Sequence, residues 1–96
     1  GIDTMLANPG SITPTTTGAY IVAVGMTHPS TNANLFISSD LSDFQSINQS
    51  DSNRNLIGGG YKAWTSGAFD PAAFTMSGSD NTGSGWVAYT FALRPA

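Results

Sequence analysis

The chain contains no cysteine and no glutamate, and it has few charged residues of any kind. Without cysteine it forms neither a disulfide nor a cysteine-based metal site. Three cations against six aspartates give a net charge of −3 with no basic cluster, so we expect no nucleic-acid partner. No stretch of the sequence approaches the roughly 20 apolar residues of a membrane span, so we expect no membrane insertion.

What the chain has in abundance is Ser, Thr, Asn and Gly, which together make up more than two fifths of it. This composition favours strands and turns over helices. A chain of 96 residues makes one small domain, and it lacks disulfides to reinforce a limited core. Its first residue is Gly rather than Met, which suggests a processed or partial chain. We therefore expect association with copies of itself, with other subunits or with an N-terminal fragment.

Period-two alternation predicts two long strands, at 18–26 and at 86–93. Both segments are apolar on each face, which is typical of strands within a β-sandwich. In the second segment the large side chains share one face, and Trp86 is the one bulky residue of the other face. We expect the large set to form the core of a central strand: Val87, Tyr89, Phe91 and Leu93.

Shorter apolar runs predict strands at 35–37, 56–64 and 74–76 and the end of a strand at 1–6. The glycines at 58–60 predict a bulge or the close approach of another backbone. The segment 40–55 fits a turn of helix or a long polar loop, and 77–85 reads as a loop that tolerates insertion. The predicted fold is an all-β, antiparallel β-sandwich of jelly-roll type. Residues 1–96 form one such domain or the C-terminal half of one.

Candidates for catalysis are few. His28, the single histidine, lies in a predicted loop before Pro29. It could serve as a general base or a metal ligand, and the competing interpretation is a solvated side chain. No Ser or Thr lies in a nucleophile elbow or a Ser-x-x-Lys motif. Asp40 and Asp43 lie in a polar segment, and we expect them to be caps or turn residues. The prediction is a protein that is not an enzyme, with a hydrolase using His28 as the remaining alternative.

Residues 51–55 place oxygen-bearing side chains at alternate positions, as a calcium loop begins. An EF-hand would need Gly at 56 and Glu at 62, where this chain has Leu56 and Lys62, so that motif is rejected. A looser calcium site at Asp51 or Asp80 competes with a simple Asx-rich turn. We predict no cofactor and no dedicated metal site.

Two tryptophans raise the question of sugar binding. Trp64 and Trp86 stand near the ends of predicted strands, and Asp80 and Asn81 lie in the loop before the last strand. Aromatic rings that stack on sugar faces, with polar groups beside them, are ingredients of carbohydrate recognition. The competing interpretation is that both tryptophans fill the core. A soluble carbohydrate-binding module is therefore the alternative function, with these four residues as its site.

The closing segment Gly-Trp-Val-Ala followed by Ala-Leu-Arg-Pro, residues 85–96, resembles the ending of β-sandwich domains in bacteriophage virion and tail proteins and related bacterial surface proteins. Residues 1–4 (Gly-Ile-Asp-Thr) and 16–23 resemble an internal motif and the central strand of such domains, whereas 40–60 match poorly. The resemblance implies a structural or adhesive module of a virion, extracellular, without catalytic residues. It also implies that strands preceding Gly1 come from a cleaved N-terminal part or a neighbouring subunit. Its partners would be virion subunits or copies of itself, and a host-surface polysaccharide.

Overall fold

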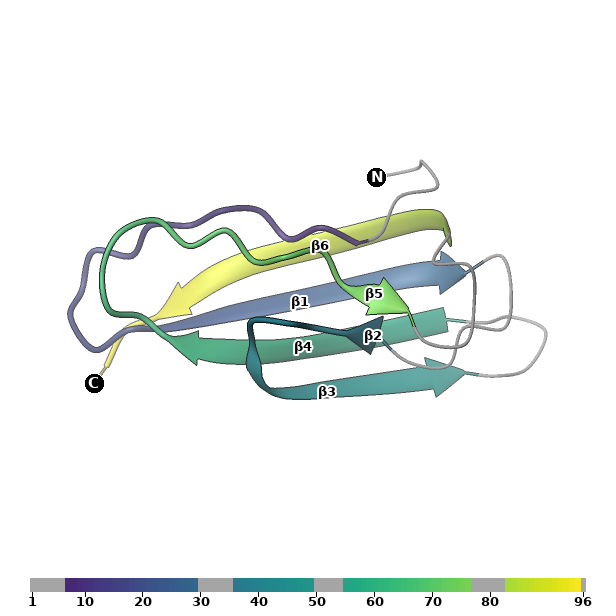
Figure 1. Ribbon diagram of the computed structural model, residues 1–96, viewed down its shortest axis with the longest axis horizontal. Helices are drawn as coiled ribbons and strands as arrows, with labels where there is room; N and C mark the ends of the chain where they lie inside the picture. The colour runs from purple at the N-terminus through teal and green to yellow at the C-terminus, as the bar shows by residue number, and fades with distance from the viewer. Residues whose placement is uncertain (1–6, 30–35, 50–54, 77–82, 96) are drawn as a thin grey trace.

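The computed structural model describes residues 7–29, 36–49, 55–76 and 83–95, whose regular secondary structure is entirely β (Figure 1). The prediction of an all-β, antiparallel chain is confirmed. The strands are β1 (Tyr20–Pro29), β2 (Phe36–Ile37), β3 (Ser42–Gln49), β4 (Asn55–Ala63), β5 (Thr75–Met76) and β6 (Gly83–Leu93).

Four of these strands form an antiparallel sheet in the order β3-β4-β1-β6. The apolar strand predicted at 18–26 is β1, which lies inside the sheet with β4 on one side and β6 on the other. The prediction that the final strand is central is wrong, because β6 is an edge strand of this sheet. Two apolar faces show only that a strand is covered or associates on both faces. They do not show how many neighbours it has along its edges.

Strand β3 was missed by the sequence analysis, which expected a helical turn or a loop there. Its polar side chains carry a weak strand signal, and its pairing with β4 supplies the hydrogen bonds that hold it extended. The register shifts between Ser42 and Gln45, and Asp43 has a φ of 52° in this irregular stretch. The bulge therefore lies opposite the triple glycine, on β3, while β4 runs continuously from Asn55 to Ala63. The close approach of another backbone is confirmed, because a Cβ on Gly60 would lie 3.0 Å from Ser42 O and one on Gly59 would lie 3.1 Å from Ala23 O.

One face of the sheet is covered by a second, less regular layer, which crosses in front of β1 and β6 in Figure 1. Residues 7–18 and 64–74 form this layer together with the two-stranded β2-β5 sheet. The amide of Ile12 donates to Phe69 O at 2.9 Å, and the amide of Phe69 donates to Ile12 O at 2.8 Å. Further along, the amide of Phe74 donates to Ala7 O at 2.9 Å. These bonds tie two distant segments into one covering layer.

The segment that leads into β3 is hydrogen-bonded to the same covering layer. The amide of Ala72 donates a hydrogen bond to Asp40 Oδ2 at 2.9 Å. Ser38 Oγ accepts from the amide of Leu41 at 3.2 Å, which closes a turn before β3. The prediction that Asp40 is a turn or capping residue is thus supported by its role in joining the turn to the covering layer.

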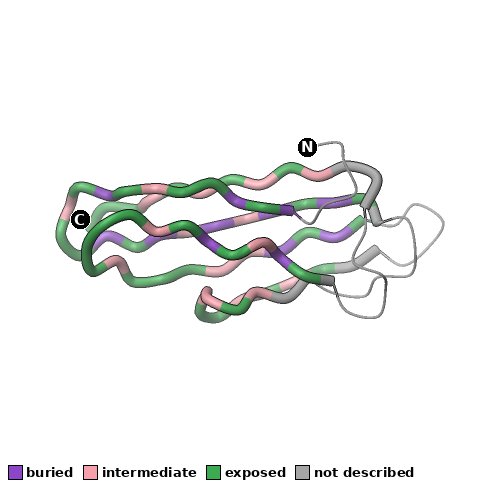
Figure 2. The backbone as a smooth tube through the Cα atoms, turned by 45° about the horizontal axis from the view of Figure 1, so that its top comes forward, coloured by how far each residue is buried: buried purple, intermediate pink, exposed green. Residues whose placement is uncertain are grey.

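The core lies between the sheet and the covering layer, where the sheet presents small residues. Phe74 is completely buried and meets Phe44 edge-on, with ring centroids 5.0 Å apart. Ala23, Leu56 and Ala7 complete the buried cluster. Buried positions accordingly alternate with less buried ones along β1 (Figure 2).

The expectation that the large residues of β6 form the core is wrong for this chain. Phe91 is 43 % exposed and Tyr89 is 64 % exposed, whereas Trp86 and Ala88 on the opposite face pack against the core cluster. The covering layer contributes Phe74, whose ring packs closely against Gly25 on the covered face. The face with the larger side chains is therefore left on the outside.

Candidate functional site

The most distinctive feature of the molecule is the side of the four-stranded sheet that none of the described segments covers, which we call the open face. Among the residues whose burial is described, nine large hydrophobic residues are exposed, and the strand register places all nine on this one face. They are Tyr20, Met26, Ile47, Ile57, Tyr61, Val87, Tyr89, Phe91 and Leu93. Among the residues whose burial is described, only three large aliphatic or aromatic hydrophobic residues are buried: Ile21, Leu56 and Phe74. Among these described residues, nine large hydrophobic side chains are therefore exposed and three are fully buried.

The open face is built in rows that run across the strands. One row joins Ile47, Ile57, Met26 and Val87, one residue from each strand in turn. A row nearer the other end joins Tyr61, Val22 and Phe91. Because side chains opposite one another on neighbouring strands lie within contact distance, each row is a continuous apolar band. Together the rows form one patch rather than scattered exposed residues.

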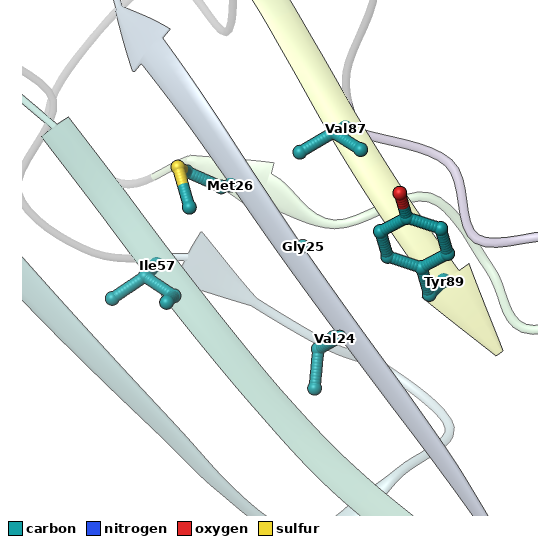
Figure 3. Close-up of a pocket in the computed structure, with 6 residues that line it drawn as sticks. All are labelled: Val24, Gly25, Met26, Ile57, Val87 and Tyr89. Carbon is teal, nitrogen blue, oxygen red and sulfur yellow. The ribbon is translucent and has the colours of Figure 1, made fainter. Parts of the chain in front are cut away.

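The surface of the patch is uneven and contains two hollows. A hollow of about 90 Å³ is lined by residues of β1, β4 and β6, and in Figure 3 side chains from all three strands surround it. The residues that line it are Val24, Gly25, Met26, Ile57, Val87 and Tyr89. A wider, shallower hollow lies toward the other end of β1, between Tyr20, Val22, Tyr61 and Leu93. Tyr20 and Tyr61 meet there edge-on, with ring centroids 5.6 Å apart.

Charge is absent from these rows. Lys62 belongs to the alternate set of β4 residues on the covered side, and its Nζ lies 5.0 Å from the centre of the Phe69 ring. Asp40 is engaged with the covering layer. The rows thus offer hydrophobic contact and tyrosine hydroxyls.

The two tryptophans proposed for sugar binding do not lie together. The amide of Trp64 donates to Ala19 O, and its Nε1 donates to Gly67 O at 2.9 Å. Trp86 pairs with Thr27 near the far end of β1 and packs on the core. Eight residues of strand separate the two positions, a distance of about 26 Å. One sugar-binding platform therefore does not contain both rings, and Asp80 and Asn81 lie outside the described residues.

The remaining candidates for chemistry are dispersed. His28 stands within β1 rather than in the predicted loop, and it is exposed. Asp51, suggested for calcium, lies outside the described residues. Within the ranges that the structure describes, no group of three or more His, Cys, Asp or Glu side chains is arranged to hold a metal. In the same ranges no helix is long and apolar enough to cross a membrane.

Comparison of the chain with protein-family models, with curated proteins and with solved structures gives no match. The candidate site is therefore identified from the strand register and the exposure of this chain's own residues. The large residues of β6 share one face, as their alternation predicts, but that face is the open face and not the interior. The available signal was that both faces of 18–26 and of 86–93 are apolar, which one covering layer cannot fully bury.

Proposed function

We propose that this chain is a non-enzymatic structural module of a multi-subunit particle, which binds a neighbouring polypeptide through the open face of its sheet. The observation that carries the proposal is the gathering of nine large exposed hydrophobic residues on that one face. Monomeric soluble proteins rarely expose a contiguous apolar patch larger than a few hundred Å². A patch of this kind is typical of a surface that binds another molecule, and we propose that this molecule is a polypeptide.

The size of the open face supports a stable interface. With 10 residues in β1 and four strands side by side, the face measures about 33 Å by about 19 Å, or roughly 600 Å². The nine exposed hydrophobic side chains supply its apolar area, and burial of apolar surface contributes about 25 cal/mol per Å² before the cost of association.

The resemblance of two sequence segments to phage domains supports the kind of particle that we propose. The ending at 85–96 and the segment at 16–23 resemble β-sandwich domains of bacteriophage virion and tail proteins. We propose a phage tail, fibre or decoration component, located in the virion or outside the cell, that packs with other subunits and contacts the host surface. In this proposal the fold is a jelly-roll-like sandwich, completed on the open face by strands from another chain or from an N-terminal part.

Fractionation of the native source tests this role. An antibody against the chain should detect it in the sedimented particle fraction, and detection only in the free protein pool would contradict the proposal. Chemical labelling tests whether the open face is the surface that is buried in the particle. A cysteine in place of Val24 should react with a maleimide in the isolated protein treated with mild denaturant, and it should be protected in particles. A cysteine in place of the exposed Ala68, in the turn after β4, is the matched control and should react in both.

The carbohydrate-binding alternative receives no support from the placement of its residues, since Trp64 and Trp86 are at opposite ends of the sheet. It stays a prediction that a glycan array tests. Specific binding that is lost in Trp64→Ala, with the fold intact by circular dichroism, would favour it over the structural role.

A further inference from the structure

We propose that the partner on the open face is a second copy of this chain, packed sheet against sheet about a twofold axis that lies between the two sheets. This inference rests on the proposed function and names its partner. Four properties of the open face lead to it: its area, its lack of charge, its relief and its position relative to the sheet edges.

The area matches what a stable dimer buries. A face of roughly 600 Å² with projecting side chains removes about 600–800 Å² from each copy, or about 1,200–1,600 Å² in total. Stable and specific interfaces bury about 1,200–2,000 Å². One face against an identical face therefore suffices, without any further segment or subunit.

The lack of charge suits a self-complementary interface. In a twofold interface each residue meets the same surface that its own copy presents, so any charge near the axis faces a like charge. The rows that include Met26, Val24 and Val22 contain no Lys, Arg, Asp or Glu. Two copies with a net charge of −3 each can thus approach through this face without repulsion at the contact.

The open face carries both projecting side chains and hollows, so one copy can fit against another. Tyr89 on β6 and Ile47 on β3 are the most exposed large hydrophobic residues, at 64 % and 70 %, and they stand on the two edge strands. Val24 lies between them on β1 and is half-buried, next to Gly59. Packed sheets lie about 10 Å apart with interdigitated side chains, so the edges of each copy would enter the shallow centre of the other.

Pairing through the edge strands is the main alternative for two copies. Strand β6 contains neither a charged residue nor proline, which are the usual protections of an edge. Joining two β6 edges would extend the sheet but leave the nine large hydrophobic residues of the open face in water. Covering the face removes this exposure, so we assign the dimer contact to the face rather than to the edge.

Sedimentation equilibrium of the purified chain tests the proposal. The wild type should behave as a dimer of twice the 9.9 kDa chain mass at micromolar concentration. Tyr89→Lys places a charge on the face at a well-exposed position and should raise the dimer dissociation constant by about 30-fold or more. Ile47→Lys tests the opposite edge strand and should act in the same direction. Ala68→Lys introduces the same charge outside the face and should leave the dimer intact.

Circular dichroism and the fluorescence of the two tryptophans report whether each variant is folded. A wild type that is monomeric at 100 μM overturns the second-copy proposal, while maleimide protection in particles still supports the proposed function with a different partner. A dimer that survives both lysine variants in folded form also overturns it, since the contact would then lie at the β6 edge or elsewhere.

Discussion

Gly25 of β1 lies directly against the ring of Phe74, so that a Cβ atom on the glycine would stand 2.8 Å from Cε2 of the phenylalanine. Carbon atoms in contact prefer about 3.5–4.0 Å, so no residue with a side chain fits there without displacing the ring. Phe74 is completely buried and anchors the covering layer. The absence of one side chain on β1 therefore sets how closely that layer approaches the sheet.

Gly25→Ala should destabilise the protein by about 1–3 kcal/mol, because the new methyl group overpacks the contact with Phe74. Urea denaturation followed by circular dichroism measures the change. Gly10→Ala is the matched control: a Cβ there has nothing within 4 Å, and stability should be unchanged or slightly higher. Equal stability of both variants would show that the covering layer adjusts freely.

Phe74→Ala should cost about 3–5 kcal/mol, because it empties the centre of the core. Phe91→Ala should act differently, since Phe91 is on the open face. Its cost should grow with protein concentration as the dimer contributes to stability, whereas the cost of Phe74→Ala should not. Urea titrations at two concentrations a hundredfold apart separate the two. If Phe91→Ala lost as much unfolding free energy as Phe74→Ala at both concentrations, Phe91 would be a core residue and not a residue of the open face.

Gly59 and Val24 make a second close contact, this time on the open face. A Cβ on Gly59 would lie 2.8 Å from Val24 Cγ1 and 3.1 Å from the carbonyl oxygen of Ala23. Gly59→Ala should therefore destabilise by about 1–3 kcal/mol. Adding Val24→Ala removes Cγ1 and should recover part of that loss, as a positive coupling of about 0.5 kcal/mol or more in a double-mutant cycle. Strict additivity would mean that the contact with the Ala23 carbonyl accounts for the whole cost.

Thr90 carries a buried hydroxyl on the covered side of β6, and in the described part of the chain its Oγ1 has no hydrogen-bond partner. A buried hydroxyl without a partner costs about 1–3 kcal/mol. Thr90→Val keeps the shape and removes the polar atom, so it should stabilise the protein by about 1 kcal/mol in thermal or urea unfolding. Thr75→Val, at an exposed position, should change stability little. A loss of stability in Thr90→Val would indicate that a bound water satisfies the hydroxyl.

Particular residues show how far the sequence predicted this structure. The alternation in 18–26 and 86–93 correctly placed β1 and β6, and the apolar residues around 58–60 placed β4. Strand β3 was missed because its residues favour a strand only when β4 supplies the hydrogen bonds. The four residues proposed as a sugar site were selected for their chemistry, and spacing along the chain gave no information that Trp64 and Trp86 lie at opposite ends of a sheet.

The sequence by itself determined that 18–26 and 86–93 are strands, because period-two alternation and a composition rich in small polar residues leave no helical alternative there. It also determined which residues share a face. Only the tertiary structure decided which face is covered, because a strand with two apolar faces does not specify which one receives the next layer. The bulk of Phe74 and Phe44 required small partners such as Gly25 and Gly60, so the face of small residues became the interior. The larger side chains were left on the open face, where the interface is proposed.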